Sequence, residues 1–265
     1  MIYSTLKGGL GNMMFEIAAM CSLAYDNNDN VCFINISSQI AYLNNETNFN
    51  PNMQHAQEYD YLLKRFDHPT PDSYVKQFNM PFHFEKLEYV NGAFYDGFFQ
   101  SEKWFAHNRH IILNILKPSY NIIKTMQSKY SHILELPNSV AIHVRRGDYV
   151  KNQQNHALMS EDYFKTAVSH FDINSNFVIF SDDILWCKEF FKMPNTFFIE
   201  NEKDYVEIYL MANMHNCIIS NSSFGWWGAW LNCNVDKKII APSIWFGPNI
   251  KHNTSDIIPV SWTKI

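Results

Sequence analysis

The residues with the clearest chemistry are two adjacent arginines at the end of a short apolar run. Residues 140–144 are mostly branched and apolar, which predicts a strand buried on both faces of a sheet. Arg145, Arg146, Gly147 and Asp148 follow it. A guanidinium holds phosphate or carboxylate through a fixed fork of donors. Because open α/β sheets bind ligands beyond the carboxyl ends of their strands, we predict an anion site here. The alternative is that each arginine pairs with an acid such as Asp148.

A glycine-rich turn near the N-terminus is a second anion-binding candidate. Residues 2–6 predict a strand, residues 7–12 form the turn, and residues 13–25 have helical spacing. This arrangement aims backbone N–H groups at an anion. Neither common nucleotide motif fits, because no Lys-Ser/Thr pair follows the glycines and Met14 stands where a dinucleotide fingerprint needs glycine. We predict close approach of a ligand to this backbone, with a plain tight turn as the alternative.

A third candidate follows residues 217–220, another predicted strand. Ser223 lies at or next to the N-cap of the next helix, where its hydroxyl and the first N–H groups would face the same crevice as Arg145. Asp182 and Asp183 also follow a predicted strand and either face that crevice or cap a helix. The sequence has no Asp-x-Asp motif to bridge a metal ion to a diphosphate. We therefore expect neither metal nor cofactor, with the arginines carrying the negative charge.

Two other stretches are candidates for binding a second substrate. In residues 93–105, aromatic rings could stack on a sugar while Gln100, Ser101 and Glu102 bond its hydroxyls; the alternative places the rings in the core. Residues 41–81 are rich in Asn, Pro, Gln and Asp without clear periodicity. We predict an irregular, partly helical segment there that contributes to an acceptor site.

The composition limits the class of protein. Of 265 residues, 46% are hydrophobic and 18% charged, which supplies the core of one large α/β domain or two smaller ones. A net charge of −5 without a basic stripe argues against a nucleic-acid partner. Five scattered cysteines indicate neither a zinc site nor a disulfide framework. Since we also find no signal peptide and no run of about 18 apolar residues, we expect a cytoplasmic protein.

The pattern of elements predicts two domains. Residues 1–137 would form an N-terminal, acceptor-side domain that carries the glycine turn. Residues 138–265 alternate short apolar strands with helices, which is typical of a Rossmann-like domain with a parallel sheet. Near the boundary, residues 107–136 predict two amphipathic helices whose lysines lie on a solvated face or, alternatively, on a membrane surface.

Four sequence blocks resemble the signatures of one family. They are Gly8-Gly9-Leu10-Gly11-Asn12-Met13-Met14-Phe15, residues 98–105, His143-Val144-Arg145-Arg146-Gly147-Asp148-Tyr149 and residues 221–231. In this order, over nearly the whole chain, they resemble the blocks of the bacterial α-1,2-fucosyltransferases, the inverting, GDP-fucose-dependent glycosyltransferases of family 11. The resemblance implies a GT-B architecture, an α/β fold of two Rossmann-like domains with the active site in the cleft between them and GDP-β-L-fucose held mainly by the second.

The resemblance also implies a reaction and its partners. L-Fucose would pass from GDP-fucose, a co-substrate, to the 2-hydroxyl of a terminal galactose on an oligosaccharide. A lipid-linked acceptor, and with it peripheral contact at the inner face of a membrane, is left open. The alternatives are another linkage or acceptor, hydrolysis of GDP-fucose, and a sugar-nucleotide-binding or glycan-binding protein without turnover. The two arginines favour an enzyme, because the departing diphosphate gains charge in the transition state.

Residue chemistry and the resemblance together assign individual roles. The catalytic set is Arg145, which would bind the β-phosphate, Arg146 and Asp148. The donor-binding set, in which His143 and Glu207 would contact the guanosine, is His143, Gly11, Asn12, Asp182, Glu207, Asn221, Ser222 and Ser223. The acceptor-binding set is Asp96, Gln100 and Glu102. Asp148 is the first candidate for the base that deprotonates the acceptor; alternatively it orients the arginines and the departing phosphate takes the proton.

The chain also departs from the family's pattern at several positions. Met13 and Glu16 stand where the family has glutamines, Glu207 stands for an aspartate and Gly225 for a serine. Polar contacts that the family makes at residues 13 and 16 are therefore not expected to carry over unchanged.

Overall fold

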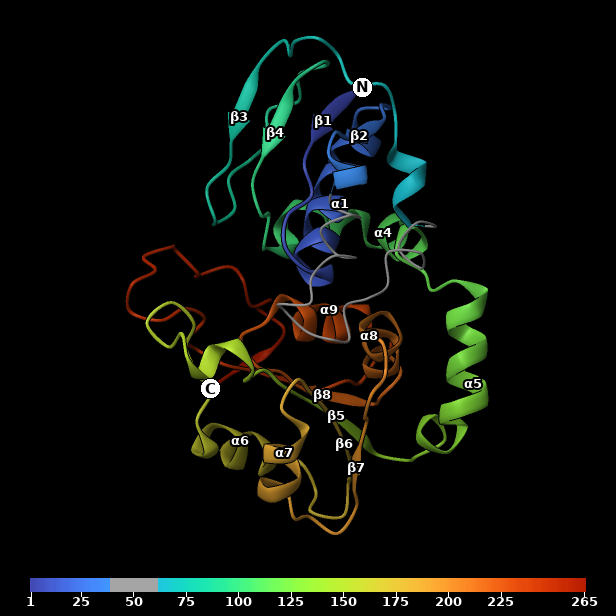
Figure 1. The fold of residues 1–265 in the computed structure, drawn as a ribbon, viewed down its shortest axis with the longest axis vertical. Coiled ribbons are helices and arrows are strands. Elements are labelled where there is room, and N and C mark those ends of the chain that lie inside the picture. The colour runs from blue at the N-terminus through green and yellow to red at the C-terminus, as the bar shows by residue number, and fades with distance from the viewer. Residues whose placement is uncertain (39–61) are drawn as a thin grey trace. The chain divides into compact units, whose positions relative to one another are not determined.

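The computed structural model describes residues 1–38 and 62–265, which form two compact units (Figure 1). Unit 1 comprises Met1–Lys117 with His252–Pro259, and unit 2 comprises Pro118–Lys251 with Val260–Ile265. Most of the irregular segment predicted for residues 41–81, namely residues 41–61, lies outside the described residues. Within the described ranges, no helix has both the length and the apolar character needed to cross a membrane.

Unit 1 is built on a parallel sheet. Across the sheet, the strands in the described residues are β2 (Val31–Phe33), β1 (Ile2–Ser4), β4 (Phe94–Asp96) and β3 (Gln77–Asn79). Helix α1 (Leu10–Asp26) joins β1 to β2, and α4 (Arg109–Ile115) packs against α1. The 3-10 helices are η2 (Lys64–Phe66), η3 (Glu102–Trp104) and η4 (Ala106–Asn108). The sequence did not predict β3 and β4, which are three residues long each.

Helix α1 begins earlier than the sequence predicts. Its first residue is Leu10 rather than Met13, so Gly11 and Asn12 lie in the first helical turn and not in the preceding loop. Most of α1 is buried, which explains why its sequence lacks a clear polar face.

The aromatic block of residues 93–105 belongs mainly to the core of unit 1. Tyr95, Phe99, Trp104 and Phe105 are all buried, whereas Phe98 is 37% exposed. The sequence left two roles open for these rings, stacking on a sugar or packing in the core. The four buried rings pack in the core. Stacking on a sugar stays a prediction for Phe98.

Unit 2 is built on a larger parallel sheet. Its strands, in order across the sheet, are β10 (Thr263–Lys264), β9 (Ile239–Ala241), β8 (Asn216–Ile218), β5 (Ser139–Val144), β6 (Asn176–Ser181) and β7 (Thr196–Phe198). Its helices are α5 (Tyr120–Leu134), α6 (Glu161–Val168), α7 (Ile184–Phe190), α8 (Asp204–Ala212) and α9 (Ser223–Leu231), with the 3-10 helix η5 (Asp148–Val150). In Figure 1, α8 and α9 lie on one side of the sheet and α6 and α7 on the other.

Side chains of the central strand β5 point alternately to the two faces of the sheet. On one face, residues such as Ile142 pack with Phe164 of α6 and Cys187 of α7. On the other face, the His143 ring lies 5.5 Å from the ring of Phe224 at the start of α9. Because β5, β6 and β8 run parallel, the residues that follow these three strands collect at one edge of the sheet.

The units divide the chain differently from the boundary expected near residue 137. Helix α5 belongs to unit 2 because it packs against α8, and Lys129 and Tyr130 both bond the buried carboxylate of Glu202. The segment His252–Pro259 belongs to unit 1, where Asp256 accepts the Phe84 N–H at 2.7 Å. Both differences come from contacts between residues far apart in the sequence, which local patterns do not reveal.

Candidate functional site

Arg145 directly follows β5 and is held on several sides. Its Nη2 lies 2.6 Å from Asp148 Oδ1 and its Nη1 lies 2.9 Å from Asp182 Oδ2. Its guanidinium lies over the Tyr149 ring, 5.3 Å from the centroid. Its backbone N–H donates to Ser220 Oγ at 3.1 Å, which ties the end of β5 to the end of β8. The side chain is 20% exposed, so a fixed cation faces solvent at the edge of the sheet.

Arg146 is engaged on α7 instead. Its Nε donates to Asp183 Oδ2 at 3.0 Å, and its guanidinium lies 4.0 Å from the centroid of the Trp186 ring. Asp183 also caps α7, since its other oxygen accepts from the Trp186 N–H. The pairing of both arginines with acids, which the sequence left as an alternative, is thus present. The catalytic role of Arg146 stays a prediction.

Asp182 supports both arginines from the end of β6. One carboxylate oxygen accepts the Arg146 N–H at 2.9 Å and the other contacts Arg145. A Cβ at Gly147 would lie only 2.6 Å from Asp182 Oδ2. Glycine at position 147 therefore lets the carboxylate lie against the turn. These contacts use both oxygens of Asp182, so it is placed as a support for the arginines.

His143 lies where β5 meets the start of α9. A Cβ at Gly225 would be 2.5 Å from His143 Nδ1, so the glycine lets the helix approach the ring. The ring is buried, and Nδ1 has no hydrogen-bond partner among the described residues. Burial, assisted by the Arg145 charge, lowers the pKa of His143 to about 3. His143 is therefore an uncharged imidazole near neutral pH.

The helix terminus beside His143 is formed by the predicted serines. Ser222 is the N-cap and Ser223 the first residue of α9, and the Ser222 side chain makes no capping hydrogen bond. Asn221 is buried and donates through Nδ2 to the carbonyls of Ala157 and Trp245. Asn221 therefore fixes the backbone ahead of α9, and the first N–H groups of this nine-residue helix provide partial positive charge.

Glu207 projects from α8 as a half-buried carboxyl without a hydrogen bond or ion pair in the described chain. Desolvation raises its pKa well above the usual value, and the nearby charges of Asp204, Glu202 and Asp182 raise it further. Asp182 also contacts Arg145, so Glu207 is electrostatically coupled to one of the acids that hold Arg145. A ligand with N–H donors would favour the ionised form of Glu207.

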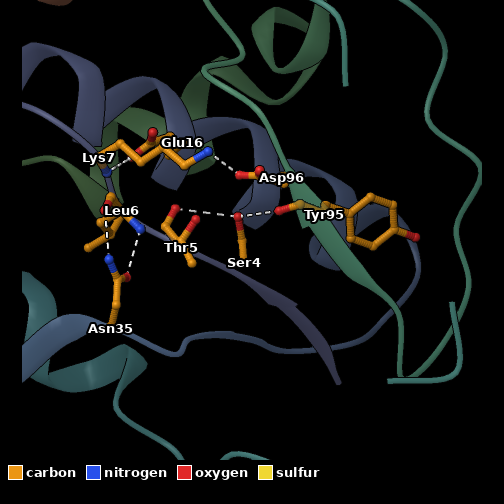
Figure 2. A network of polar contacts seen from close by, with 8 residues as sticks. All are labelled: Ser4, Thr5, Leu6, Lys7, Glu16, Asn35, Tyr95 and Asp96. Atoms are coloured by element: carbon orange, nitrogen blue, oxygen red, sulfur yellow. Dashed lines mark hydrogen bonds and ion pairs between the residues drawn. The ribbon is translucent and has the colours of Figure 1, made fainter. Parts of the chain in front are cut away.

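Unit 1 has its own polar network at the end of β1 (Figure 2). Asn35 bonds both the N–H and the carbonyl of Leu6, and Glu16 Oε2 accepts the Lys7 N–H at 2.8 Å. The Lys7 ammonium forms an ion pair with Asp96 at the end of β4. The turn before α1 is thereby fixed by side chains from other elements.

The remaining predicted residues of unit 1 lie near that turn. Gln100 is buried and donates to Asn12 Oδ1 at 2.8 Å, so it supports Asn12. A Cβ at Gly8, whose φ is +69°, would lie 2.6 Å from Asn12 Nδ2. Glu102 is half-buried at the start of η3. The donor-binding and acceptor-binding roles of these residues stay predictions.

Glu16 is a buried acid that sequence reasoning did not place in the site. Its side chain has no exposed surface, and Oε1 has no hydrogen-bond partner in the described part of the chain. Burial raises its pKa well above the usual value, with a smaller contribution from Asp96, despite the Lys7 contacts that lower it. A single acid within the otherwise apolar run of residues 13–21 was the available signal.

Tyr149 and Ser220 were also missed as supports of Arg145. The signal for Tyr149 was its position four residues after Arg145 in a tight turn, which returns its ring to the arginine. The signal for Ser220 was weaker, since a serine after a strand is common.

In the ranges 1–38 and 62–265, no three His, Cys, Asp or Glu side chains are grouped so that they could hold a metal ion.

Comparison of the sequence with known proteins gives one family and two curated relatives. Residues 2–265 match the profile of Glycosyl transferase family 11. An alpha-1,2-colitosyltransferase of Escherichia coli is 30% identical over 289 residues, covering 100% of this chain and 98% of the relative. The O-antigen biosynthesis glycosyltransferase WbnK of Escherichia coli is 27% identical over 310 residues and covers both chains completely.

Comparison of the fold finds solved fucosyltransferases. NodZ alpha-1,6-fucosyltransferase soaked with GDP-fucose has a TM-score of 0.53 at 13% identity, covering 95% of this chain and 97% of NodZ. POFUT1 in complex with GDP has a TM-score of 0.50 at 10% identity, covering 90% and 97%. The α/β fold with parallel sheets is therefore of the GT-B type, as the sequence predicted.

The buried acid Glu16 gives a testable pH dependence. Since its pKa is raised by folding, the folded chain keeps a proton that the unfolded chain releases above about pH 4.5. The contribution of Glu16 to the free energy of unfolding should thus fall as the pH rises, by up to about 1.4 kcal/mol per pH unit, until the folded pKa is reached. Glu16→Gln removes this titration, so its stability relative to wild type should increase from pH 5 to pH 8.

Urea unfolding of both proteins across this pH range measures the difference. The exposed Glu189, changed to Gln, is the control, and its difference from wild type should stay constant. A Glu16→Gln difference that is the same at both ends of the range would contradict a protonated Glu16.

Proposed function

Because the chain belongs to glycosyl transferase family 11, we propose that it transfers L-fucose from GDP-β-L-fucose to the 2-hydroxyl of a terminal galactose, with inversion at the fucose carbon. The acceptor would be a galactose-terminated oligosaccharide, free or lipid-linked. The names of the two relatives, one an alpha-1,2-colitosyltransferase and one an O-antigen glycosyltransferase, support a 1,2-linkage and an oligosaccharide acceptor.

The observation that carries the proposal is the fixed Arg145 at the end of β5. When the bond between fucose and phosphate breaks, the GDP that leaves gains negative charge. Donors already aimed at that charge lower the barrier without reorganising. Arg145 has five N–H groups, and Asp148 and Asp182 each contact one of its terminal nitrogens, which leaves N–H groups to bind the β-phosphate.

The two acids on Arg145 differ in a way that suits this role. Asp182 has 12% side-chain exposure and is also bonded to the Arg146 N–H, so it is fixed. Asp148 has 42% exposure, and its carboxylate contacts only Arg145 in the described chain. A phosphate oxygen can therefore replace Asp148 on Arg145. The released carboxylate would then be available to take the proton of the acceptor hydroxyl.

The rest of unit 2 offers contacts for the nucleotide. We assign the guanosine to His143 and Glu207, and a phosphate to the N-terminus of α9 at Ser222 and Ser223. Ionised Glu207 would accept the two N–H donors on the edge of guanine. Since the pKa of Glu207 is raised, GDP binding would be accompanied by proton release. We propose that the diphosphate is held in this way without a metal ion.

A second candidate donor is GDP-colitose. The relative at 30% identity is named an alpha-1,2-colitosyltransferase, and colitose is L-fucose without its 3-hydroxyl. An enzyme that hydrogen-bonds this hydroxyl rejects a substrate lacking it by up to about 10⁴-fold to 10⁵-fold. The ratio of kcat/KM for the two donors therefore distinguishes the two functions.

The direct test is a transfer assay in excess EDTA with a panel of galactosides. We expect transfer from GDP-fucose, a new α-1,2 linkage by NMR, and unchanged rates after Mn²⁺ or Mg²⁺ is added. Faster transfer from GDP-colitose would favour the second donor, and another linkage would correct the acceptor position. Binding of GDP without any transfer to any galactoside would contradict the proposed function.

A substitution at Asp148 tests the proton transfer. If Asp148 is the base, Asp148→Asn should lower kcat by roughly 10²-fold to 10⁴-fold, while GDP affinity is kept or raised because a competitor for Arg145 is gone. If Asp148 only orients Arg145, GDP affinity and kcat should fall together. The measurements are steady-state kinetics and calorimetric titration with GDP.

The exposed Asp236, changed to Asn, is the control for the general effect of removing a surface charge. Near-normal kcat in Asp148→Asn would remove Asp148 from the mechanism. The search for a base would then move to Asp96 and Glu102.

A further inference from the structure

Tyr149 contacts both anion-binding features of unit 2. We propose that Tyr149 is a positioning residue that holds the Arg145 guanidinium at a fixed place relative to the start of α9, so that the two bind one diphosphate together. The inference rests on the proposed function, since it requires Arg145 to bind that diphosphate. It adds a residue to which neither the sequence motifs nor the predicted site gave a role.

The first contact is with Arg145 itself. The guanidinium carbon lies 5.3 Å from the centroid of the Tyr149 ring. The tight turn of η5, closed by the Val150 N–H on the Arg146 carbonyl at 2.9 Å, brings the ring back to the arginine. A cation over an aromatic face is attracted by the ring electrons, and the attraction is stronger where water is partly excluded. The ring therefore restricts the plane of the guanidinium, while Asp148 and Asp182 bind its nitrogens.

The second contact is with the segment that leads into α9. The Tyr149 hydroxyl donates to the Asn221 carbonyl at 3.3 Å, and Asn221 directly precedes the N-cap Ser222. Asn221 is itself fixed, since its Nδ2 donates to the carbonyls of Ala157 and Trp245 at 2.8 and 2.7 Å. A single side chain thus joins the arginine after β5 to the backbone that begins α9.

The ring of Tyr149 is held in place by its own neighbours. His156 stacks on it at 4.4 Å between centroids and 8° between planes. The Asn155 carbonyl accepts the Gly247 N–H at 2.9 Å, and a Cβ at Gly247 would lie 2.3 Å from the Gln153 carbonyl oxygen. The loop that carries His156 is therefore packed closely on the residues around position 247. Tyr149 rests on a fixed surface, which a positioning residue requires.

The chemistry of His156 fits this arrangement. Burial lowers its pKa, and the Arg145 charge lowers it further, against an opposing effect of Asp148. His156 is therefore mostly uncharged near neutral pH. An uncharged imidazole supports the Tyr149 ring without repelling the guanidinium that lies over it.

A purely structural tyrosine would stabilise the loop without acting through Arg145. The two roles differ in one consequence. If Tyr149 acts through Arg145, removing the ring should matter only while Arg145 is present, because residues that act on one interaction are not additive. If Tyr149 only stabilises the loop, removing the ring should lower activity by the same factor with and without Arg145.

The experiment is a double-mutant cycle in the intact protein. Tyr149→Met, which fills similar space without a ring, is combined with Arg145→Ala, and kcat/KM for GDP-fucose and Kd for GDP are measured. We expect Tyr149→Met to lower kcat/KM by about 3-fold to 30-fold in the wild-type background, the range that cation–π contacts span. In the Arg145→Ala background the same change should cost less than about 2-fold.

Two further variants keep the test independent of folding defects. Tyr149→Phe keeps the ring over Arg145 and loses only the hydroxyl bond to the Asn221 carbonyl, so it should lose part, but not all, of the activity that Tyr149→Met loses. Tyr163→Phe is the matched control, since Tyr163 also donates its hydroxyl to a backbone carbonyl near α9, that of Ile219 at 2.6 Å, without contacting Arg145. It should stay within about 2-fold of wild type in both backgrounds.

The outcomes separate the inference from the function on which it rests. Equal losses for Tyr149→Met with and without Arg145, or a Tyr149→Phe variant with wild-type kcat/KM, would overturn the positioning role. If Arg145→Ala itself left GDP binding and transfer unchanged, the proposed function would fail first. A strong effect of Arg145→Ala with no effect of Tyr149→Met would leave the function in place and refute this inference alone.

Discussion

The site of unit 2 depends on how one cation is held at the end of a buried strand. Strand β5 is buried along its whole length, and Arg145 is the second residue after the imidazole of His143. A guanidinium without partners at the end of β5 would lose part of its hydration. Carboxylates bonded to it compensate for that loss. Asp182 and Asp148 supply these interactions, but only Asp182 is itself tied to the backbone. Arg145 is thus held by one fixed acid and one exposed acid, and the proposed function requires phosphate to replace the exposed one.

The parallel sheet explains why these residues meet. The arginines follow β5, Asp182 follows β6 and Ser220 follows β8, and the three strands are neighbours. For the arginines the sequence predicted this place, and for Asp182 it predicted either this crevice or a helix cap, because apolar runs that end in charged residues are visible without a structure. It did not predict the part played by Ser220. It also predicted the α/β class, and the resemblance to known family blocks led to the GT-B type.

The sequence could not predict which aspartate pairs with which arginine side chain. Asp182 and Asp183 are adjacent in the sequence, yet one contacts Arg145 and the other caps α7 and binds Arg146. This choice depends on side-chain direction at the end of β6 and on the space at Gly147, which are properties of the folded turn. In the same way, the sequence did not predict the hydrogen bond from Gln100 to Asn12, which depends on how the residues after β4 pack against α1.

The proposed function requires Arg145 to bind the β-phosphate of the leaving nucleotide. Calorimetric titration of wild type and Arg145→Ala with GDP, and with GMP, which lacks that phosphate, measures this contact. We predict that wild type binds GDP more tightly than GMP by about 10-fold to 100-fold, equivalent to one charge-assisted hydrogen bond, and that most of this preference is lost in Arg145→Ala while GMP affinity is unchanged. A preference for GDP that is equally large in both proteins would show that Arg145 does not bind the β-phosphate.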